Sequence, residues 1–283
     1  MTHKIDIAAT GFAFLEGPRW RDGKLYFSDM HDAKVYSMVP GQAPEIIATI
    51  PQSPSGIGWL PDGRMLIVSM IDKRVLVRAK DGTLSTWADL SSLAPRRIND
   101  MVVSEDGTAY VGNFGFMFNE GEPPAATVLA RIAPDQSVHT AADGLLFPNG
   151  PVITPDGKTL IVAETFAAKL TAFDIAPDSS LSNRRDWANL QDGAVPDGIC
   201  LDAEGAIWVA SPTTGTFLRI REGGEVLDKI NTGRMAIACT LGGEDGKTLF
   251  MFTSESTEPD ICKAAMSARI ETVRVDVPGA GSP

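Results

Sequence analysis

Short apolar runs alternate with acidic turns along the whole chain. Six times, an acidic residue and a glycine precede a run of apolar residues that is typical of a β-strand. The six turn glycines are Gly23, Gly63, Gly107, Gly157, Gly205 and Gly246. They are 40, 44, 50, 48 and 41 residues apart, and an all-β repeat of this length is typical of a propeller blade. The pattern therefore predicts an all-β fold, a six-bladed β-propeller.

Each repeat contains four segments with strand character. In the first repeat these are residues 17–21, 24–28, 34–39 and 45–49. The Asp-Gly dipeptide between the first two predicts a tight hairpin, so we expect four antiparallel strands per blade. The sixth repeat supplies only three segments, near 237–241, 248–253 and 269–277. We expect residues 4–8 to complete that blade, because pairing the two ends of the chain leaves no exposed edge.

Composition narrows the classes of partner. The chain is 43% hydrophobic and 22% charged, as globular proteins are, and the repeats fill residues 1–283 as one propeller domain. A net charge of −11 argues against nucleic acid, which needs a basic surface. No apolar run reaches the roughly 18 residues of a membrane helix. Residues 1–6 contain no apolar signal segment and the three cysteines show no disulfide pattern, so we expect a cytoplasmic protein.

The phase of the repeat places polar residues together. Eight residues before the turn glycine stand Asn99, Asn149 and Asp197 in three repeats, and Glu16 holds the equivalent place in the first repeat, whose turn is one residue shorter. The second and sixth repeats have Ser55 and Ala238 there. This position begins the innermost strand of each blade. Oxygen donors from four blades are therefore expected to converge around the axis.

Each of these residues alone also fits a structural turn, as in Pro148-Asn149-Gly150 and Pro196-Asp197-Gly198. Their shared phase favours a functional site. Two carboxylates and two amide carbonyls form a hard donor set, which suits Ca²⁺, Mg²⁺ or Mn²⁺. The sequence predicts a site for one divalent cation.

Five motifs containing these residues carry a family resemblance. They are Leu15-Glu16-Gly17-Pro18, Arg97-Ile98-Asn99-Asp100, Phe147-Pro148-Asn149-Gly150, Pro196-Asp197-Gly198-Ile199 and Leu241-Gly242-Gly243. Through their order and spacing, the chain resembles the senescence-marker-protein/regucalcin/gluconolactonase family, which includes luciferin-regenerating-enzyme-like proteins, over nearly its whole length. The resemblance implies a six-bladed propeller that binds one divalent cation and hydrolyses lactones.

The resemblance also implies roles for single residues. Glu16, Asn149 and Asp197 match the metal ligands of the family, and Asn99 matches a residue beside the metal that also touches substrate. Arg97 matches a substrate-binding arginine, although a structural ion pair would also explain it. Asp197 further matches the proton acceptor and donor. We expect Ca²⁺ as the cofactor, with Mg²⁺, Mn²⁺ or Zn²⁺ as alternatives.

The connections after the second strand of each blade should border the same site. They offer His31, Phe114, Glu164 and Phe166 as substrate-binding candidates. Because these connections are rich in Phe and Met, they favour a lactone with an aromatic or alkyl part over a sugar lactone. Each aromatic residue could equally serve packing.

We therefore expect a divalent-metal-dependent lactonase. The metal would polarise the lactone carbonyl and a general base would activate water. No Gly-x-Ser-x-Gly motif supports a serine esterase. The alternatives are a non-catalytic propeller that binds a cation or a protein, and a hydrolase of another ester at the same metal. The expected partner is a small-molecule lactone, and the sequence predicts no oligomeric state.

Overall fold

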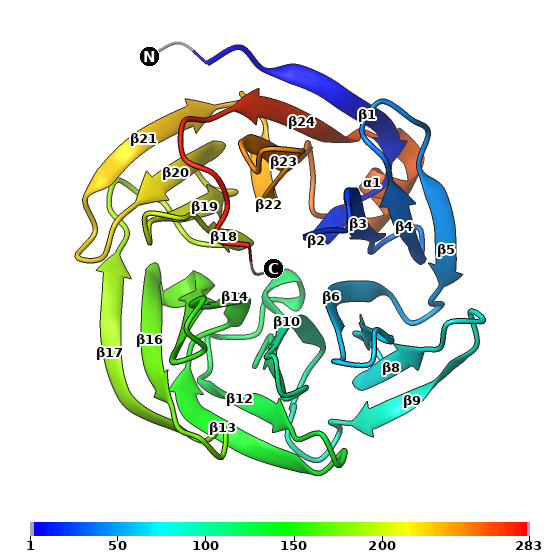
Figure 1. The fold of residues 1–283 in the computed structure, drawn as a ribbon, viewed down its shortest axis with the longest axis vertical. Coiled ribbons are helices and arrows are strands. Elements are labelled where there is room, and N and C mark those ends of the chain that lie inside the picture. The colour runs from blue at the N-terminus through cyan, green and yellow to red at the C-terminus, as the bar shows by residue number, and fades with distance from the viewer. Residues whose placement is uncertain (1–2, 282–283) are drawn as a thin grey trace.

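Six four-stranded antiparallel sheets stand around a central axis in the computed structural model of the chain, which describes residues 3–281 (Figure 1). Each sheet runs from an innermost strand near the axis to an outermost strand at the rim. This arrangement confirms the predicted six-bladed β-propeller. No helix in residues 3–281 is long and apolar enough to cross a membrane.

The strands of each blade follow one another in the chain, from the axis outward. The first blade contains β2 (Leu15–Arg21), β3 (Lys24–Asp29), β4 (Lys34–Met38) and β5 (Glu45–Thr49). The second contains β6 (Pro54–Trp59), β7 (Met65–Ser69), β8 (Arg74–Arg78) and β9 (Leu84–Asp89). The third contains β10 (Ile98–Val103), β11 (Ala109–Asn113), β12 (Thr127–Ile132) and β13 (Val138–Leu145).

The remaining blades repeat this order, with one exception at the end. The fourth contains β14 (Pro148–Ile153), β15 (Thr159–Glu164), β16 (Lys169–Ile175) and β17 (Leu181–Asn189). The fifth contains β18 (Ile199–Leu201), β19 (Ile207–Ser211), β20 (Thr216–Ile220) and β21 (Val226–Asn231). The sixth contains β22 (Met235–Gly242), β23 (Thr248–Ser254), β24 (Ala268–Arg274) and, from the other end of the chain, β1 (Asp6–Phe12).

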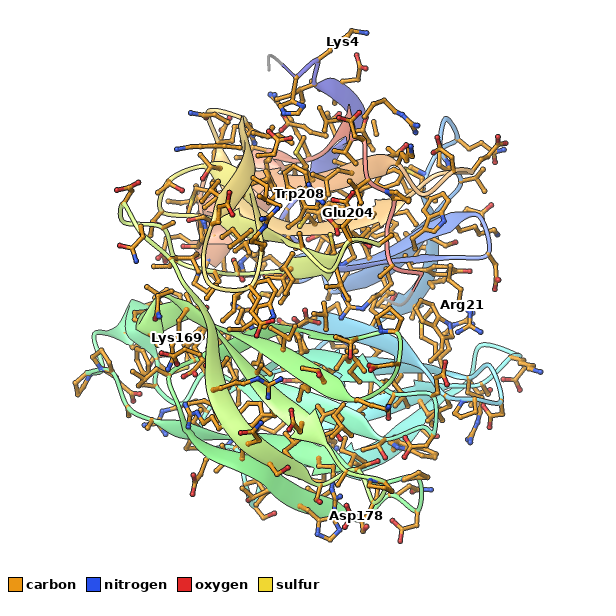
Figure 2. All side chains as sticks on the ribbon, turned by 60° about the vertical axis from the view of Figure 1, so that its left-hand side comes forward. Lys4, Arg21, Lys169, Asp178, Glu204 and Trp208 are labelled. Atoms are coloured by element: carbon orange, nitrogen blue, oxygen red, sulfur yellow. The ribbon has the colours of Figure 1, made fainter. Side chains whose placement is uncertain are left out.

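Burial decreases from the middle of each blade to its rim. Every residue of β7, β11 and β19 is buried, because both faces of these strands pack against neighbouring blades. The outermost strands are largely exposed, as in β5 and β21. In Figure 2, Lys4 and Asp178 lie at the edge of the molecule, whereas Trp208, which is 1% exposed, lies within it. The core therefore consists of apolar layers between adjacent blades.

The innermost strands approach one another very closely. A Cβ atom on Gly198 would lie 2.5 Å from the Cβ of Ala238 in the next blade, a distance that real Cβ atoms essentially never show. Gly17 has a φ of +55°, and a Cβ there would lie 2.7 Å from the backbone oxygen of Ser55. Each of these glycines directly follows a residue of the predicted polar set. The close approach therefore holds the polar residues near the axis.

The N-terminal strand closes the ring. β1 pairs antiparallel with β24, which confirms the predicted closure, but it covers residues 6–12 instead of 4–8. The reason is Phe12, which is 4% exposed and whose ring lies 5.5 Å from those of Phe27 and Tyr36. This buried ring fixes the position of the strand, whereas Ile7 in the predicted segment is 57% exposed.

Three connections contain short helices that the strand pattern did not predict. η1 (Phe118–Glu120) lies between β11 and β12, η2 (Thr165–Ala167) lies between β15 and β16, and α1 (Pro259–Ala265) lies between β23 and β24. Proline occupies the first turn of α1, where its missing N–H costs no hydrogen bond. All three helices contribute to the wall of the cavity described below.

The closure makes a prediction about stability. Phe12→Ala should lower the free energy of unfolding by about 3–5 kcal/mol, because it leaves a cavity between β1 and the first blade. Ile7→Ala in the same strand is the control and should change it by no more than about 0.5 kcal/mol. Urea denaturation of both variants checks this. Equal effects of the two substitutions would show that Phe12 does not anchor the closing strand.

Candidate active site

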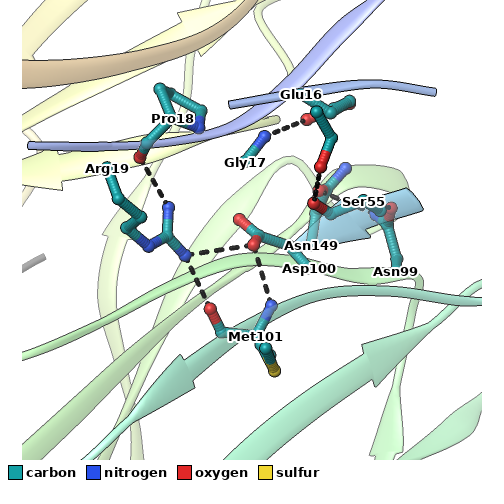
Figure 3. Close-up of polar contacts among 10 residues, drawn as sticks. Glu16, Gly17, Pro18, Arg19, Ser55, Asn99, Asp100, Met101 and Asn149 are labelled. Atoms are coloured by element: carbon teal, nitrogen blue, oxygen red, sulfur yellow. Dashed lines mark hydrogen bonds and ion pairs between the residues drawn. The ribbon is translucent and has the colours of Figure 1, made fainter. Parts of the chain in front are cut away.

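A chain of hydrogen bonds links the innermost strands of four blades. The Oγ of Ser55 donates to Oδ1 of Asn99 at 3.1 Å, and Nδ2 of Asn99 donates to Oδ1 of Asn149 at 2.9 Å. Nδ2 of Asn149 then donates to Oδ1 of Asp197 at 2.5 Å. The residues that share one phase of the repeat therefore meet around the axis, and Figure 3 shows four of them, Glu16, Ser55, Asn99 and Asn149, together. We refer to these four residues and Asp197 as the polar ring.

Within the polar ring, Glu16 has few hydrogen-bond partners. Its carboxyl is 4% exposed, and within residues 3–281 its only hydrogen bond is from the backbone N–H of Gly17, at 3.3 Å. Burial raises the pKa of Glu16 well above its ordinary value, and the nearby Asp197 and Asp100 raise it further. A carboxyl buried beside other acids is stabilised by binding either a proton or a nearby cation.

Asp197 shares this environment. Burial raises its pKa from 3.8 to about 8, the charge of Asp100 adds to the increase, and the hydrogen bond from Asn149 opposes it. Two buried carboxyls that influence each other cannot both ionise cheaply in the absence of a positive charge. Acidic groups in a cavity whose pKa values are strongly raised by burial are typical of functional sites.

A buried ion pair lies beside the ring. Nη2 of Arg19 donates to Oδ1 of Asp100 at 3.1 Å and to the backbone oxygen of Met101 at 2.6 Å, and both charged side chains are 5% exposed (Figure 3). This pair joins β2 to β10, which are 81 residues apart in the sequence. The periodicity gave no sign of it. The only signal was that Asp100 belongs to one of the family motifs and Arg19 directly follows another.

A cavity of about 420 Å³ opens above the ring. Its floor contains Glu16, Asn99, Asn149 and Asp197. Its walls are mostly apolar and include Met30 and Met70 of the connections expected to border the site. They also include residues that were not among the predicted site residues, namely Phe14, Phe118, Phe147, Val195, Met235 and Pro259. The volume lies in the range of small-molecule sites, about 300–1,000 Å³.

Four of the five residues that the sequence assigned to substrate outside the ring line this cavity. They are Arg97, His31, Phe114 and Phe166. Arg97 is half-buried and forms no ion pair within residues 3–281, so the structural alternative for this residue has no support in the described chain. Its guanidinium is available to a ligand.

The structure does not bring Glu164 into the cavity. Its carboxyl is 1% exposed, Oε2 accepts the backbone N–H of Leu146 at 2.8 Å, and Oε1 accepts Nη2 of Arg184 at 3.1 Å. Glu164 ends strand β15, and these bonds direct its side chain into the blade to hold the connection before β14. We therefore leave it out of the proposed substrate contacts.

His31 lines the cavity from the connection between β3 and β4. Burial lowers its pKa to about 4, and the positive charges of Lys263 and Arg97 lower it further. Nε2 lies 3.3 Å from the backbone oxygen of Thr257, which can only accept, so Nε2 carries the proton. The imidazole is therefore neutral near pH 7 and presents Nδ1 as an acceptor.

The fold and the floor together define a six-bladed propeller with a buried set of carboxyl and amide groups at one mouth of its axis. The chain belongs to the family described as SMP-30/Gluconolactonase/LRE-like, whose model matches residues 14–255. This finding confirms the resemblance that the motifs indicated.

Relatives and solved structures agree with this family. The chain is 28% identical to regucalcin of Xenopus laevis over 249 residues, which cover 83% of this chain and 81% of the relative. It is 23% identical to 6-deoxy-6-sulfogluconolactonase of Pseudomonas putida over 281 residues, which cover 95% and 93% of the two chains.

Among solved structures, a luciferin-regenerating enzyme superposes with a TM-score of 0.84 at 18% identity, over 98% of this chain and 97% of that one. A calcium-binding regucalcin of Agrobacterium tumefaciens superposes with a TM-score of 0.81 at 20% identity, over 98% and 95%. At this level of identity the likeness establishes the fold.

The raised pKa of Asp197 makes a prediction about stability and pH. Because the folded value of about 8 exceeds the ordinary 3.8, folding favours the protonated carboxyl. The resulting stabilisation is complete below pH 3.8 and is lost as the pH rises to about 8. After exhaustive chelation and desalting, Asp197→Asn should therefore raise Tm at pH 8 by at least about 2–4 °C, the equivalent of about 1 kcal/mol. The increase should be smaller at pH 5.

Asp192→Asn is the matched control, because Asp192 is an exposed acid five positions earlier in the same connection. Its Tm should follow that of the unmodified protein at both pH values. Thermal scans monitored by circular dichroism measure the difference. A Tm of Asp197→Asn that is unchanged or lower at pH 8 would show that Asp197 is not destabilised by burial.

Proposed function

We propose that this protein is a divalent-metal-dependent lactonase. The observation that carries the proposal is the floor of the cavity, where Glu16, Asn99, Asn149 and Asp197 bring two carboxyls and two amides together out of water. Family membership supports it, since two of the relatives are named as lactonases. The substrate would be a small-molecule lactone.

The floor fits a divalent cation. No group of three or more His, Cys, Asp or Glu residues is placed to hold a metal in the described chain, so amide oxygens would have to complete the ligand set. Glu16 has lone pairs without protein partners, and a cation between Glu16 and Asp197 would let both ionise. Asn149 would join them after a half-turn of its amide, which exchanges Nδ2 for Oδ1 at the side facing Asp197.

These ligands would be Glu16, Asn149 and Asp197, with Asn99 beside them. All are hard oxygen donors, which favours Ca²⁺, with Mg²⁺ or Mn²⁺ as alternatives and Zn²⁺ less suited because no His or Cys is among these ligands. The calcium-binding regucalcin with the same fold is consistent with this choice. When bound, the cation would supply positive charge to the oxyanion that forms during hydrolysis.

Asp197 is the proposed general base. Its carboxylate accepts a proton from water as the water oxygen adds to the lactone carbonyl carbon. The ring C–O bond then breaks, and the leaving alkoxide receives that proton, so the product is a hydroxy acid and Asp197 returns to its starting state. The amide flip of Asn149 would end its hydrogen bond to Asp197 and leave that carboxylate oxygen free to accept the proton.

Arg97 and His31 would position the lactone. Arg97 can donate to the carbonyl or to another acceptor of the substrate, because no carboxylate of the described chain occupies its guanidinium. His31 is neutral and can accept from a substrate hydroxyl through Nδ1. Neither residue needs to change its protonation state in the reaction.

The roles of the two carboxyls can be separated by kinetics. Asp197→Asn keeps an oxygen for the cation but removes the base, so kcat should fall about 10²- to 10⁴-fold even at saturating Ca²⁺. Glu16→Gln weakens the binding of the cation without removing the base, so the rate of this variant should recover as the Ca²⁺ concentration is raised. Acid release from a lactone panel, followed with a pH indicator, measures both. Asp192→Asn should retain full activity at every Ca²⁺ concentration.

Two results would contradict this scheme. Equal rescue of both variants by Ca²⁺ would reduce Asp197 to a ligand only. Unchanged activity and Tm after exhaustive chelation would remove the cation altogether, since a ligand bound only by the folded protein must raise its stability. Ca²⁺ binding without hydrolysis of any lactone would instead identify a non-catalytic cation-binding propeller.

A further inference from the structure

Five phenylalanines form one wall of the cavity or the packing directly behind it. Phe114, Phe116 and Phe118 follow strand β11, Phe147 precedes β14, and Phe166 lies in η2 (Thr165–Ala167). Phe114 stacks on Phe147 with ring centroids 4.4 Å apart, and Phe116 meets Phe166 edge to face at 4.8 Å. Phe147 and Phe166 are 5.2 Å apart. We refer to these five residues as the aromatic wall.

The aromatic wall is not fully used by packing. Phe116 and Phe147 are 2% and 4% exposed, but Phe118 and Phe166 are each 42% exposed and both line the cavity. Their neighbours in space are other rings of the same wall. Two half-exposed phenylalanines on a rigid aromatic base therefore present an open apolar surface to whatever enters the cavity.

This surface adjoins the reactive floor. Phe147 stands two residues before Asn149, and Phe166 follows Thr165, whose Oγ1 lies 3.2 Å from Nδ2 of Asn149. A substrate whose reacting carbon lies over Asn149 and Asp197 would thus place a neighbouring substituent against the aromatic wall.

One backbone conformation and one side-chain contact hold the wall in place. Phe147 has a φ of +60°, a left-handed conformation that is unfavourable for a bulky residue. Strain of this kind is usually retained where it positions a functional group. Phe118 is held through Glu122, which accepts Nη2 of Arg96 at 2.6 Å and the backbone N–H of Met117 at 2.8 Å. These bonds tie the connection between β11 and β12 to the wall.

Polar partners for a substrate are scarce outside the floor. The Oγ1 of Thr165 already donates to the backbone oxygen of Pro196 at 2.8 Å, and that of Thr213 donates to Gly193 at 2.7 Å. Beyond His31, this leaves Arg97, Asn119 and Thr257 as the lining side chains outside the floor with free donors within the described residues. The hydroxyls of a sugar lactone would lose water and find few replacements.

We propose that the site takes a lactone that carries an aryl or alkyl group, in preference to a polyhydroxylated sugar lactone, and that Phe118 and Phe166 bind this group. The inference rests on the proposed lactonase function. An aryl group fits best, because the exposed rings can meet it edge to face or offset, as they already meet one another.

Three δ-lactones with the same reacting ring test this inference. They are δ-phenyl-δ-valerolactone, unsubstituted δ-valerolactone and glucono-δ-lactone. The phenyl compound should have the highest kcat/KM and glucono-δ-lactone the lowest. Phe118→Ala and Phe166→Ala should each lower kcat/KM for the phenyl compound about 10- to 100-fold and leave δ-valerolactone within about twofold, since only the substituent loses its contact. Ile46→Ala, at an exposed apolar residue of the rim strand β5, should change neither.

A binding measurement separates this inference from the proposed function. 6-Phenylpiperidin-2-one, the lactam analogue that resists hydrolysis, should bind the Ca²⁺-loaded protein in calorimetry and bind Phe118→Ala more weakly. If no lactone is hydrolysed but the lactam binds in this way, the proposed function is wrong and the aromatic subsite stands. If glucono-δ-lactone is hydrolysed as well as the phenyl compound, or if both Ala variants affect all three lactones equally, the substrate class inferred here is wrong and the lactonase function stands.

Discussion

The close approach of the innermost strands around one axis is the constraint on which the rest of the structure depends. At Gly17 and Gly198 the backbone of one blade comes so near the next that no side chain fits between them. The residue before each glycine, Glu16 or Asp197, therefore cannot turn away from the axis into a gap between blades. Five blades place polar groups there, and the ring of blades excludes water from them. The chemistry of the floor is thus a consequence of how tightly the propeller closes, and the pairing of β1 with β24 maintains that closure.

The buried carboxyls near the axis differ in whether the protein supplies a positive charge beside them. Arg19 neutralises Asp100 locally, through a buried contact that also joins two blades. Glu16 and Asp197 have no such partner of their own, so burial raises the pKa of both. Hydrogen bonds among Ser55, Asn99 and Asn149 stabilise the ring but cannot supply charge. A site that is destabilised when empty and offers hard oxygen donors is suited to a divalent cation, whose charge would let both carboxyls ionise and leave Asp197 able to accept a proton.

The sequence allowed the blade number, the closure and the polar ring to be predicted, because each depends on the repeat. A residue's phase decides whether it reaches the axis, so Glu16, Asn99, Asn149 and Asp197 could be selected without knowing any distance. Contacts that join different repeats were harder to predict. The Arg19–Asp100 pair joins blades that are not neighbours in the chain, and the position of β1 depends on one buried ring, Phe12. Glu164 was wrongly expected in the cavity, because a residue at a strand end can face the connection or the blade, and its bonds to Leu146 and Arg184 direct it into the blade.

The cavity therefore combines two parts with different structural freedom. The floor is built by the first residues of inner strands, where the neighbouring blade leaves no room for change. The walls are built by connections and insertions, which tolerate change because they face solvent. In this chain the connection after β11 is lengthened and held by Glu122, and it supplies Phe118 to a wall that Phe147 and Phe166 complete. Family membership accordingly bears on the reaction through the floor, whereas the choice of substrate must be argued from the walls of each chain, since the same fold can present different groups there.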